Sequence, residues 1–308
     1  MANITAAMVK ELREITGAGM MDCKKALTET NGDMQEAVNW LRTKGLAAAA
    51  KKSSRTAAEG LIAVCVEGTK GAIIEVNAET DFVGRNELFQ TFAKEVAKIA
   101  LHNDADLDKT LTSAYPGTGR DVSAELTHLV ATIGENMMIR RASMISVNDG
   151  VVADYIHNQV APNVGKIGVL VALESKGDKK KLAELAKQIA MHIAATGPQS
   201  NKVDDLDQKL VDTERRVFTE QARESGKSDD VIAKMIDGRI RKYYEQVILH
   251  EQTFVMDGDR KISQVVSDAA KDVGADVALV GFICYKLGEG IEKEEKDFAA
   301  EVAAQLTV

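Results

Sequence analysis

Two segments of this chain, about ninety residues apart, share one pattern: β-forming residues, a short polar turn and an amphipathic helix. Aligned on AKEVA and AKQIA, their helices superimpose, with 22 positions from Gly71 to Ala93 and 21 from Gly165 to Ala186. Apolar residues three to four positions apart mark one face of a helix. These residues are Phe89, Phe92 and Val96 in the first segment and Leu182, Leu185 and Ile189 in the second. The pattern predicts a duplicated strand–turn–helix unit, and therefore an α+β core.

The turn of the first segment, NAETDFVGRN, contains two large apolar residues, Phe82 and Val83. Turns are normally built from Gly, Asn, Asp and Ser. The second segment makes its turn from residues 175–178, SKGD, without an aromatic side chain. Phe82 is therefore not needed to form such a turn. Two interpretations stay open: Phe82 folds back into the core as a local plug, or it contacts another molecule.

The N-terminal residues 5–42 predict three short helices, the third beginning after the N-cap residue Asp33. Met20 and Met21 lie in the glycine-containing turn between the first two helices. They either pack between helices or form an adaptable contact surface, as methionine does at binding sites. Residues 44–59 have no apolar periodicity, so they predict a linker or a loosely packed helix.

The remaining segments add strands and helices to this core. LIAVCVEGTKGAIIEV predicts a β-hairpin, and residues 121–145 predict a second helix pair. Residues 203–249 predict two long helices joined by a polar turn, an antiparallel coiled-coil hairpin projecting from the body. Its expected apolar stripe is Val203, Leu206, Leu210 and Val217, then Ile232, Met235, Ile236, Tyr243 and Val247. After a last β segment, ADVALVGFICYKL, the tail predicts an amphipathic helix that packs on its own core or lies in a partner's groove.

Composition narrows the class of protein. The 308 residues carry a net charge of −8, which argues against direct binding of nucleic acid. Three cysteines, far apart and without a CxxC pair, predict reduced thiols in a cytosolic protein. No export signal and no apolar run long enough for a membrane span is visible. We therefore expect a cytoplasmic protein.

The sequence offers no catalytic constellation. It has no GxxxxGK[ST] phosphate loop, no GxSxG, and no dinucleotide fingerprint. The five histidines show no metal-ligand spacing. We therefore expect a protein that binds other proteins, without enzymatic activity, cofactor or metal. A hydrolase or transferase using His157 or His192 and a non-catalytic adaptor are the alternatives.

Several long motifs together resemble one known family. They are VKELREITGAGMMDCKKALTETNGDMQEAVNWLR, EVNAETDFVGRN, IGENMMIRR, YIHN, KIGVLVAL, TFVMD and GEGIEKEEKDFAAEVAA. In this order and spacing they resemble bacterial elongation factor Ts over essentially the whole chain. The resemblance implies a guanine-nucleotide exchange factor for elongation factor Tu, the GTPase that delivers aminoacyl-tRNA to the ribosome. No covalent chemistry is needed for this activity.

The resemblance also implies a domain organisation, which matches the segments above. It comprises a ubiquitin-associated-like three-helix module with its linker (1–55), a core N-subdomain (56–145), a core C-subdomain (146–200 and 250–286), a coiled-coil insertion (201–249) and a C-terminal helical module (287–308). The duplicated core or the coiled coil is a candidate surface for self-association.

The residues implied to contact elongation factor Tu lie in several of these units. They are Thr80, Asp81, Phe82 and Val83 of TDFV; Met20, Met21 and Lys24 of the N-terminal module; Ile133 of IGEN, His157 of YIHN and Val255 of TFVM; and Phe298 and Val302 of the tail. Phe82 would wedge between helices of the GTPase near its magnesium and phosphate site, so that GDP leaves. This chain departs from the family after His157, where NQVAPNVGK is longer than the usual turn, and at Gln305, where an apolar contact would be natural.

Overall fold

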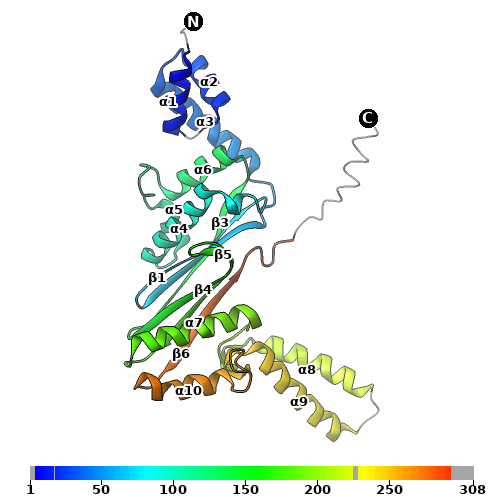
Figure 1. The fold of residues 1–308 in the computed structure, drawn as a ribbon. Coiled ribbons are helices and arrows are strands. Elements are labelled where there is room, and N and C mark those ends of the chain that lie inside the picture. Colours follow the sequence, from blue (N-terminus) through cyan, green and yellow to red (C-terminus); the bar gives the residue numbers. More distant parts are fainter. Residues whose placement is uncertain (1–3, 17, 225–227, 293–308) are drawn as a thin grey trace.

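The computed structural model describes residues 4–16, 18–224 and 228–292. It is an α+β protein with a three-helix module at one end, a layered core, and a helical hairpin that projects from the other end (Figure 1). None of the described helices is both long enough and apolar enough to cross a membrane.

The three-helix module is formed by α1 (Ala6–Thr16), α2 (Met20–Glu29) and α3 (Met34–Lys52). Asp33 is the N-cap of α3, because its carboxylate accepts a hydrogen bond of 2.8 Å from the Glu36 N–H. The small core of the module includes Leu12 and Leu27, both fully buried. Helix α3 continues to Lys52 through most of the predicted linker, and it contacts helix α6 of the core.

The first half of the core follows this module. Its elements are β1 (Glu59–Glu67), β2 (Lys70–Ala78), the 3-10 helix η1 (Val83–Arg85), α4 (Glu87–His102), α5 (Leu107–Thr112), α6 (Val122–Ile133) and β3 (Met137–Ser146). The predicted hairpin forms as β1 and β2. The helix pair predicted for residues 121–145 is wrong, because a helix is followed there by a strand. Strand β3 carries Arg140 and Arg141, which obscure its alternation of apolar and polar residues.

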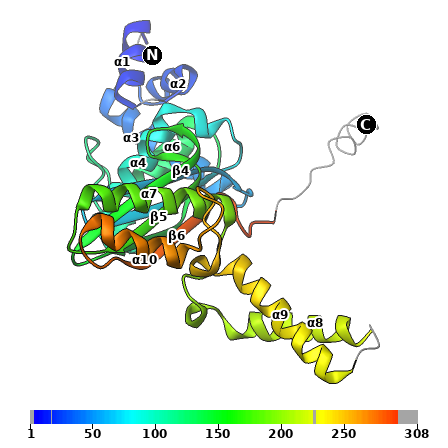
Figure 2. The same ribbon diagram turned by 60° about the horizontal axis from the view of Figure 1, so that its bottom comes forward.

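The second half repeats the element order of the first. Its elements are β4 (Gly150–Ala161), β5 (Val164–Glu174), α7 (Lys179–Thr196), the 3-10 helices η2 (Val203–Asp205) and η3 (Leu249–Glu251), α10 (Ile262–Val273) and β6 (Ala278–Lys286). Strands β3, β2 and β1 pair in one half, strands β4, β5 and β6 pair in the other, and two residue pairs between β1 and β5 join them in one sheet. Figure 2 shows α7 and α10 lying together over the second half.

The inner faces of the two halves pack against each other, and helices cover their outer faces. A Cβ on Gly71 would lie 2.7 Å from the Val152 side chain, and a Cβ on Gly168 would lie 2.5 Å from that of Ile62. Ile62 pairs with Glu75 in the strand of Gly71, and Val152 pairs with Ala172 at the same distance after Gly168. Ile62 and Val152 therefore occupy equivalent positions in the two hairpins. The two close approaches are therefore the same contact made once by each half. At either position the Cβ of another residue would force the facing side chain to shift.

This symmetry corrects the predicted alignment of the repeat. Gly71 corresponds to Gly168 rather than to Gly165. Counted from Gly71 and from Gly168, residues at equal distances face the same side of the sheet. The residues that face the outer helices are Ala72, Ile74 and Val76 in β2 and Val169, Val171 and Leu173 in β5. With this register, the connection from strand to helix is eight residues in the first half, 79–86, and four in the second, 175–178.

The projecting hairpin consists of α8 (Gln208–Arg223) and α9 (Asp229–Val247). It is inserted between α7 and η3 (Figure 1). The predicted apolar stripe is partly wrong on the first helix. Leu210 and Val217 are exposed, whereas Val211, Phe218 and Ala222 pack against α9. The second helix follows the prediction more closely, since Ile232, Ile236 and Val247 are buried.

Candidate functional site

The eight-residue connection between β2 and α4, residues 79–86, presents an aromatic side chain to solvent. We call this segment the Phe82 loop. Phe82 is 74% exposed, so the interpretation of Phe82 as a core plug is wrong. Its neighbour Asp81 is also exposed, whereas Val83 is 3% exposed and belongs to the core of the first half. The TDFV segment therefore divides into a tip, Asp81 and Phe82, and a buried anchor, Val83.

The C-terminal side of the Phe82 loop is fixed by local hydrogen bonds. The Arg85 N–H donates to the Phe82 carbonyl at 3.0 Å, which closes the short helix η1. The Asn86 carboxamide oxygen accepts from the Leu88 N–H at 2.9 Å and caps α4. The Gln90 amide donates to the Gly84 carbonyl at 3.0 Å. The loop therefore enters α4 as a continuous hydrogen-bonded turn.

The N-terminal side of the Phe82 loop is held by the residues that follow α6. The Glu135 carboxylate accepts from the Thr80 N–H at 2.9 Å and from the Thr80 hydroxyl at 2.6 Å. In the opposite direction, the Asn136 N–H donates to the Glu79 carboxylate at 2.6 Å. In each direction a carboxylate accepts from a backbone N–H of the other segment, so the two segments fix each other's backbone position.

The same contacts reach the chain that connects the three-helix module to the core. The Asn136 amide donates to the Arg55 carbonyl at 2.7 Å, and the Arg55 guanidinium lies 3.4 Å from the Glu79 carboxylate. We call the set Arg55, Glu79, Thr80, Glu135 and Asn136 the clasp. Sequence reasoning did not single out Glu135 or Asn136, although both belong to the quoted IGEN motif. Their partners lie 55 to 81 residues away, so no local pattern could have revealed them.

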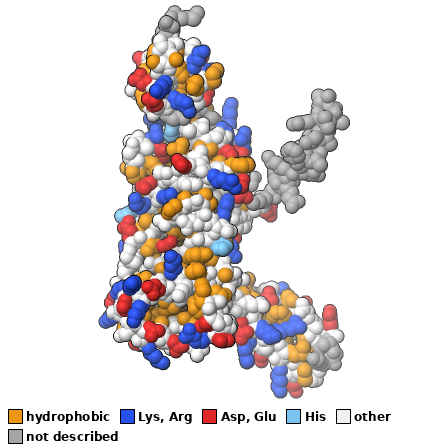
Figure 3. Space-filling model, viewed as in Figure 1, with side chains coloured by type: hydrophobic (Ala, Val, Ile, Leu, Met, Phe, Trp, Pro, Cys, Tyr) orange, Lys and Arg blue, Asp and Glu red, His pale blue; other side chains and the backbone are white. Residues whose placement is uncertain are grey.

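The three residues predicted in the N-terminal module are all exposed on α2. Met20 is 61% exposed and Met21 is 74% exposed. They lie in the first turn of α2 and not in a glycine turn, because the helix begins directly after Gly19. Lys24 is one turn further along. Packing of the two methionines between helices is thus wrong, and hydrophobic side chains do reach the surface of this module (Figure 3).

Of the remaining predicted residues, Ile133 lies close to the clasp along the chain, and His157 lies on β4. Ile133 is the last residue of α6, two positions before Glu135. His157 is exposed on β4, opposite Ile167. The adjacent Lys166 side chain reaches the Gly60 carbonyl at 3.4 Å, at the start of β1. Asn158 has a left-handed backbone with φ 51°, and β4 continues past it to Ala161 with a register shift between Gln159 and Ala161.

Val255 belongs to the second half, in the loop before α10, where it is 48% exposed. Its N–H donates to His192 Nδ1 at 3.3 Å, so His192 Nε2 carries the proton and donates to the Gln252 carboxamide oxygen at 2.9 Å. Burial lowers the pKa of His192, which has no exposed surface. His192 therefore holds the Val255 loop as a neutral side chain, and it is not placed to meet a substrate. Phe298 and Val302 lie outside the described residues.

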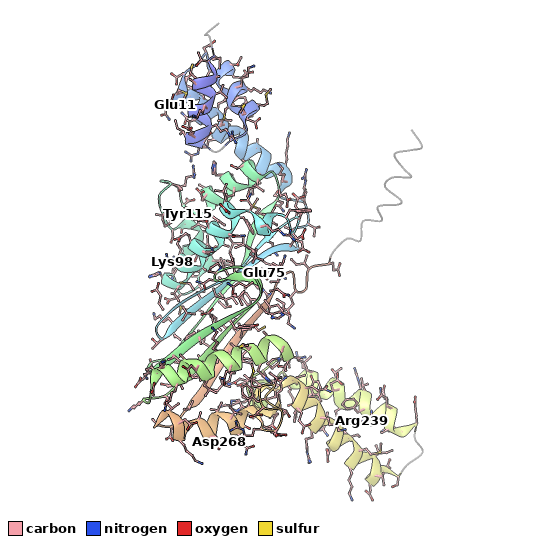
Figure 4. The ribbon with its side chains drawn as sticks, in the orientation of Figure 1. Glu11, Glu75, Lys98, Tyr115, Arg239 and Asp268 are labelled. Atoms are coloured by element: carbon pink, nitrogen blue, oxygen red, sulfur yellow. The ribbon has the colours of Figure 1, made fainter. Side chains whose placement is uncertain are left out.

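A second network fixes the chain where it leaves β6. Glu75 is fully buried in β2 and accepts hydrogen bonds from the Gly288 N–H at 2.8 Å, from Asn77 at 3.0 Å and from Arg141 Nε at 2.6 Å. Arg140 contacts the same carboxylate at 3.2 Å. Burial raises the pKa of Glu75, but these donors outweigh burial and the pKa lies below its usual value. In Figure 4, Glu75 lies in the sheet near the segment that follows β6.

The fold and the site together define a class of protein: an α+β scaffold of two equivalent halves that displays an aromatic side chain on a firmly held loop. Among the residues that the structure describes, no group of three or more His, Cys, Asp or Glu side chains is arranged to hold a metal ion.

Comparison with known proteins identifies the family. Residues 79–289 match the family model of elongation factor Ts. The chain is 62% identical over 304 residues to elongation factor Ts of Rhodospirillum centenum, with 99% of both chains covered. It is 60% identical over 304 residues to that of Parvibaculum lavamentivorans and 58% identical over 307 residues to that of Rhodospirillum rubrum, again with 99% of both chains covered. The chain therefore belongs to the elongation factor Ts family of translation elongation factors.

Proposed function

We propose that this protein is a guanine-nucleotide exchange factor that binds elongation factor Tu with GDP and promotes the release of GDP. The observation that carries the proposal is the exposure of Phe82, 74%, on a loop whose two ends are fixed by hydrogen bonds and by the buried Val83. A large apolar side chain on a loop gains free energy when a partner covers it. A fixed loop also loses little conformational entropy on binding.

In this mechanism, the tip formed by Asp81 and Phe82 enters the GTPase domain near its magnesium and phosphate site. Burial of one phenylalanine contributes about 1.5–3 kcal/mol, and about 1.4 kcal/mol corresponds to a tenfold change in an equilibrium constant. Phe82 alone then accounts for about one to two orders of magnitude of GDP weakening. The coupling is reciprocal, so GDP weakens the binding of this protein to the GTPase by the same factor. No covalent step is needed, and the protein acts without enzymatic chemistry of its own.

The rest of the binding energy is assigned to contacts outside the loop. Met20, Met21 and Lys24 of the three-helix module, which we take to be ubiquitin-associated-like, contact the GTPase domain in this proposal. Further contacts come from Ile133, His157 and Val255 of the core and from Phe298 and Val302 of the tail. Their exposure supports the proposal where they are described, except for Ile133, which is half-buried.

The proposal also covers the division of the chain into units, its self-association and its location in the cell. The division into units 1–55, 56–145, 146–200 with 250–286, 201–249 and 287–308 is part of it, with α8 and α9 as a coiled coil. The core or this coiled coil is the proposed surface for self-association, and the cytoplasm is the proposed location.

Stopped-flow release of a fluorescent GDP from elongation factor Tu tests the proposal. The wild-type protein is compared with Phe82→Ala and with the matched control Val280→Ala, which removes an apolar side chain that is 46% exposed on β6. We expect acceleration by the wild-type protein and by the control. In Phe82→Ala the rate falls by about tenfold or more, as burial of one phenylalanine requires.

Two results would contradict this proposal. Stable binding of elongation factor Tu without faster GDP release would favour an adaptor, whose function is only to hold partners together. Equal acceleration by the wild-type protein and Phe82→Ala would separate the activity from the Phe82 loop.

A further inference from the structure

We propose that Glu135 is a positioning residue for nucleotide exchange: it holds Thr80 so that Phe82 projects from the loop in the orientation that the partner requires. The inference rests on the proposed function and adds to it a residue that does not itself reach the partner's nucleotide site. Glu135 acts through the Phe82 loop.

The contact constrains the loop more tightly than one hydrogen bond would. Both carboxylate oxygens of Glu135 are used, one by the Thr80 N–H at 2.9 Å and the other by the Thr80 hydroxyl at 2.6 Å. The first bond fixes the backbone and the second fixes the side-chain rotamer of the same residue. Thr80 lies two positions before Phe82, and the buried Val83 lies one position after it. The exposed tip is therefore held at points on both sides.

Glu135 is itself well placed to act as an anchor. It follows Gly134, whose left-handed backbone with φ 91° ends α6. It precedes Asn136, which donates to Glu79 at 2.6 Å and to the Arg55 carbonyl at 2.7 Å. The carboxylate is thus attached between the end of a packed helix and the first residue of β3. Glu135 therefore fixes the position of the Phe82 loop relative to the core.

The second half of the protein provides an internal comparison. Helix α10 ends at Gly274, again with a left-handed backbone, φ 83°, and Ala275 occupies the place of Glu135. The matching connection there, residues 175–178, is four residues shorter and carries no exposed aromatic side chain. The scaffold therefore folds without a carboxylate at this point. The carboxylate is found in the half that carries the loop, which indicates a role in the loop and not in the scaffold.

The experiment compares Glu135→Ala, the residue of the second half, with the conservative variant Glu135→Gln. The glutamine carbonyl can accept from the Thr80 N–H while its NH₂ group donates to the Thr80 hydroxyl. Maximal GDP release from elongation factor Tu is measured at saturating concentrations of each variant. Loss of hydrogen bonds to a charged acceptor corresponds to about a tenfold change in an equilibrium constant. We expect the maximal rate to fall by about tenfold in Glu135→Ala and to be largely restored in Glu135→Gln.

Epistasis with Phe82 distinguishes positioning from general damage. If Glu135 acts through Phe82, Glu135→Ala lowers the maximal rate in the wild-type background and has no further effect in Phe82→Ala. Equal losses in both backgrounds, or equal rates for the alanine variant and wild type, overturn the inference. If Glu135→Ala does not fold, Thr80→Val takes its place, since it removes the hydroxyl donor from the same contact. Failure of the wild-type protein to accelerate release would instead overturn the proposed function.

Discussion

Neutralising Glu75 tests whether its charge stabilises the core. The perturbation is Glu75→Gln, which keeps the size of the side chain and replaces one carboxylate oxygen with an NH₂ group. In the wild-type protein one oxygen accepts from Asn77 and Gly288, and the other accepts from Arg141. Arg140 contacts both oxygens. A glutamine must therefore direct a donor toward at least one existing donor. It also removes the buried carboxylate that Arg140 and Arg141 share, which leaves Arg141 only the more exposed carboxylate of Glu289 at 3.4 Å.

The magnitude follows from these contacts. Removing one partner of a buried ion pair costs about 3–5 kcal/mol. The Arg140 and Arg141 side chains keep 25% and 30% exposure, so water can solvate part of their charge. We therefore expect Glu75→Gln to lower the free energy of unfolding by about 2–4 kcal/mol at neutral pH.

The pH dependence of this effect has a definite sign. The pKa of Glu75 in the folded protein lies below its ordinary value of 4.5. Between these two values the unfolded chain binds a proton that the folded chain does not, so stability rises with pH. The contribution of Glu75 is fully present above its unfolded pKa and is lost as the pH falls through the lowered folded pKa. The difference between wild type and Glu75→Gln must therefore shrink at acidic pH.

Urea unfolding followed by circular dichroism measures both effects. At pH 7 the midpoint should fall by about 1 M, given a slope of about 3 kcal/mol per molar urea. Glu67→Gln is the matched control, because Glu67 ends the neighbouring strand β1 and its side chain is 53% exposed. Its midpoint should stay close to that of the wild-type protein. Equal midpoints for wild type and Glu75→Gln at pH 7, or a difference that grows toward pH 4, would refute the reasoning.

Two further substitutions test the packing of the core and of the hairpin. Gly168→Ala would place a Cβ 2.5 Å from a side chain of the facing half, so we expect a loss of about 1–3 kcal/mol in urea unfolding; Gly281→Ala, whose Cβ would meet nothing closer than 3.6 Å, is the control, and equal losses would contradict the face-to-face arrangement. On α8, Val211→Ala should lower the melting temperature of the hairpin, because it removes a buried side chain. Leu210→Ala should leave the melting temperature nearly unchanged, because Leu210 is 44% exposed. The opposite result would support the apolar stripe predicted from sequence.

Much of the fold was predictable because its signals are local. The hairpin of β1 and β2, the N-cap at Asp33 and the two amphipathic core helices follow from turn residues and apolar spacing. The repeat was also visible, but its register was not. The second segment offers Gly165 and Gly168 as partners for Gly71, and only the facing strand shows that Gly168 is the equivalent. A contact between the facing halves of the sheet leaves no trace in the residue spacing of either strand.

The candidate site was likewise predictable only where its signals are local. The sequence marks Phe82 as an unusual turn residue, and the structure shows that it is exposed while its neighbour Val83 is buried. No periodicity separates these two apolar residues, because the loop belongs to neither a strand nor a helix. Glu135 could not be singled out for another reason: it is one carboxylate among many, and its hydrogen-bond partner Thr80 is 55 residues away in the sequence.

Comparing the halves shows where new features were added to the common scaffold. The first half is longer between β2 and α4, where the Phe82 loop lies, and the second half is longer between α7 and η3, where the hairpin lies. At Gly71 and Gly168 the facing halves approach so closely that a larger residue in one half would displace side chains of the other. Connections at the ends of the strands are free of this restriction. The features that distinguish the halves therefore lie in the connections, and each needs its own anchor: the clasp for the Phe82 loop, and a separate apolar core for the hairpin.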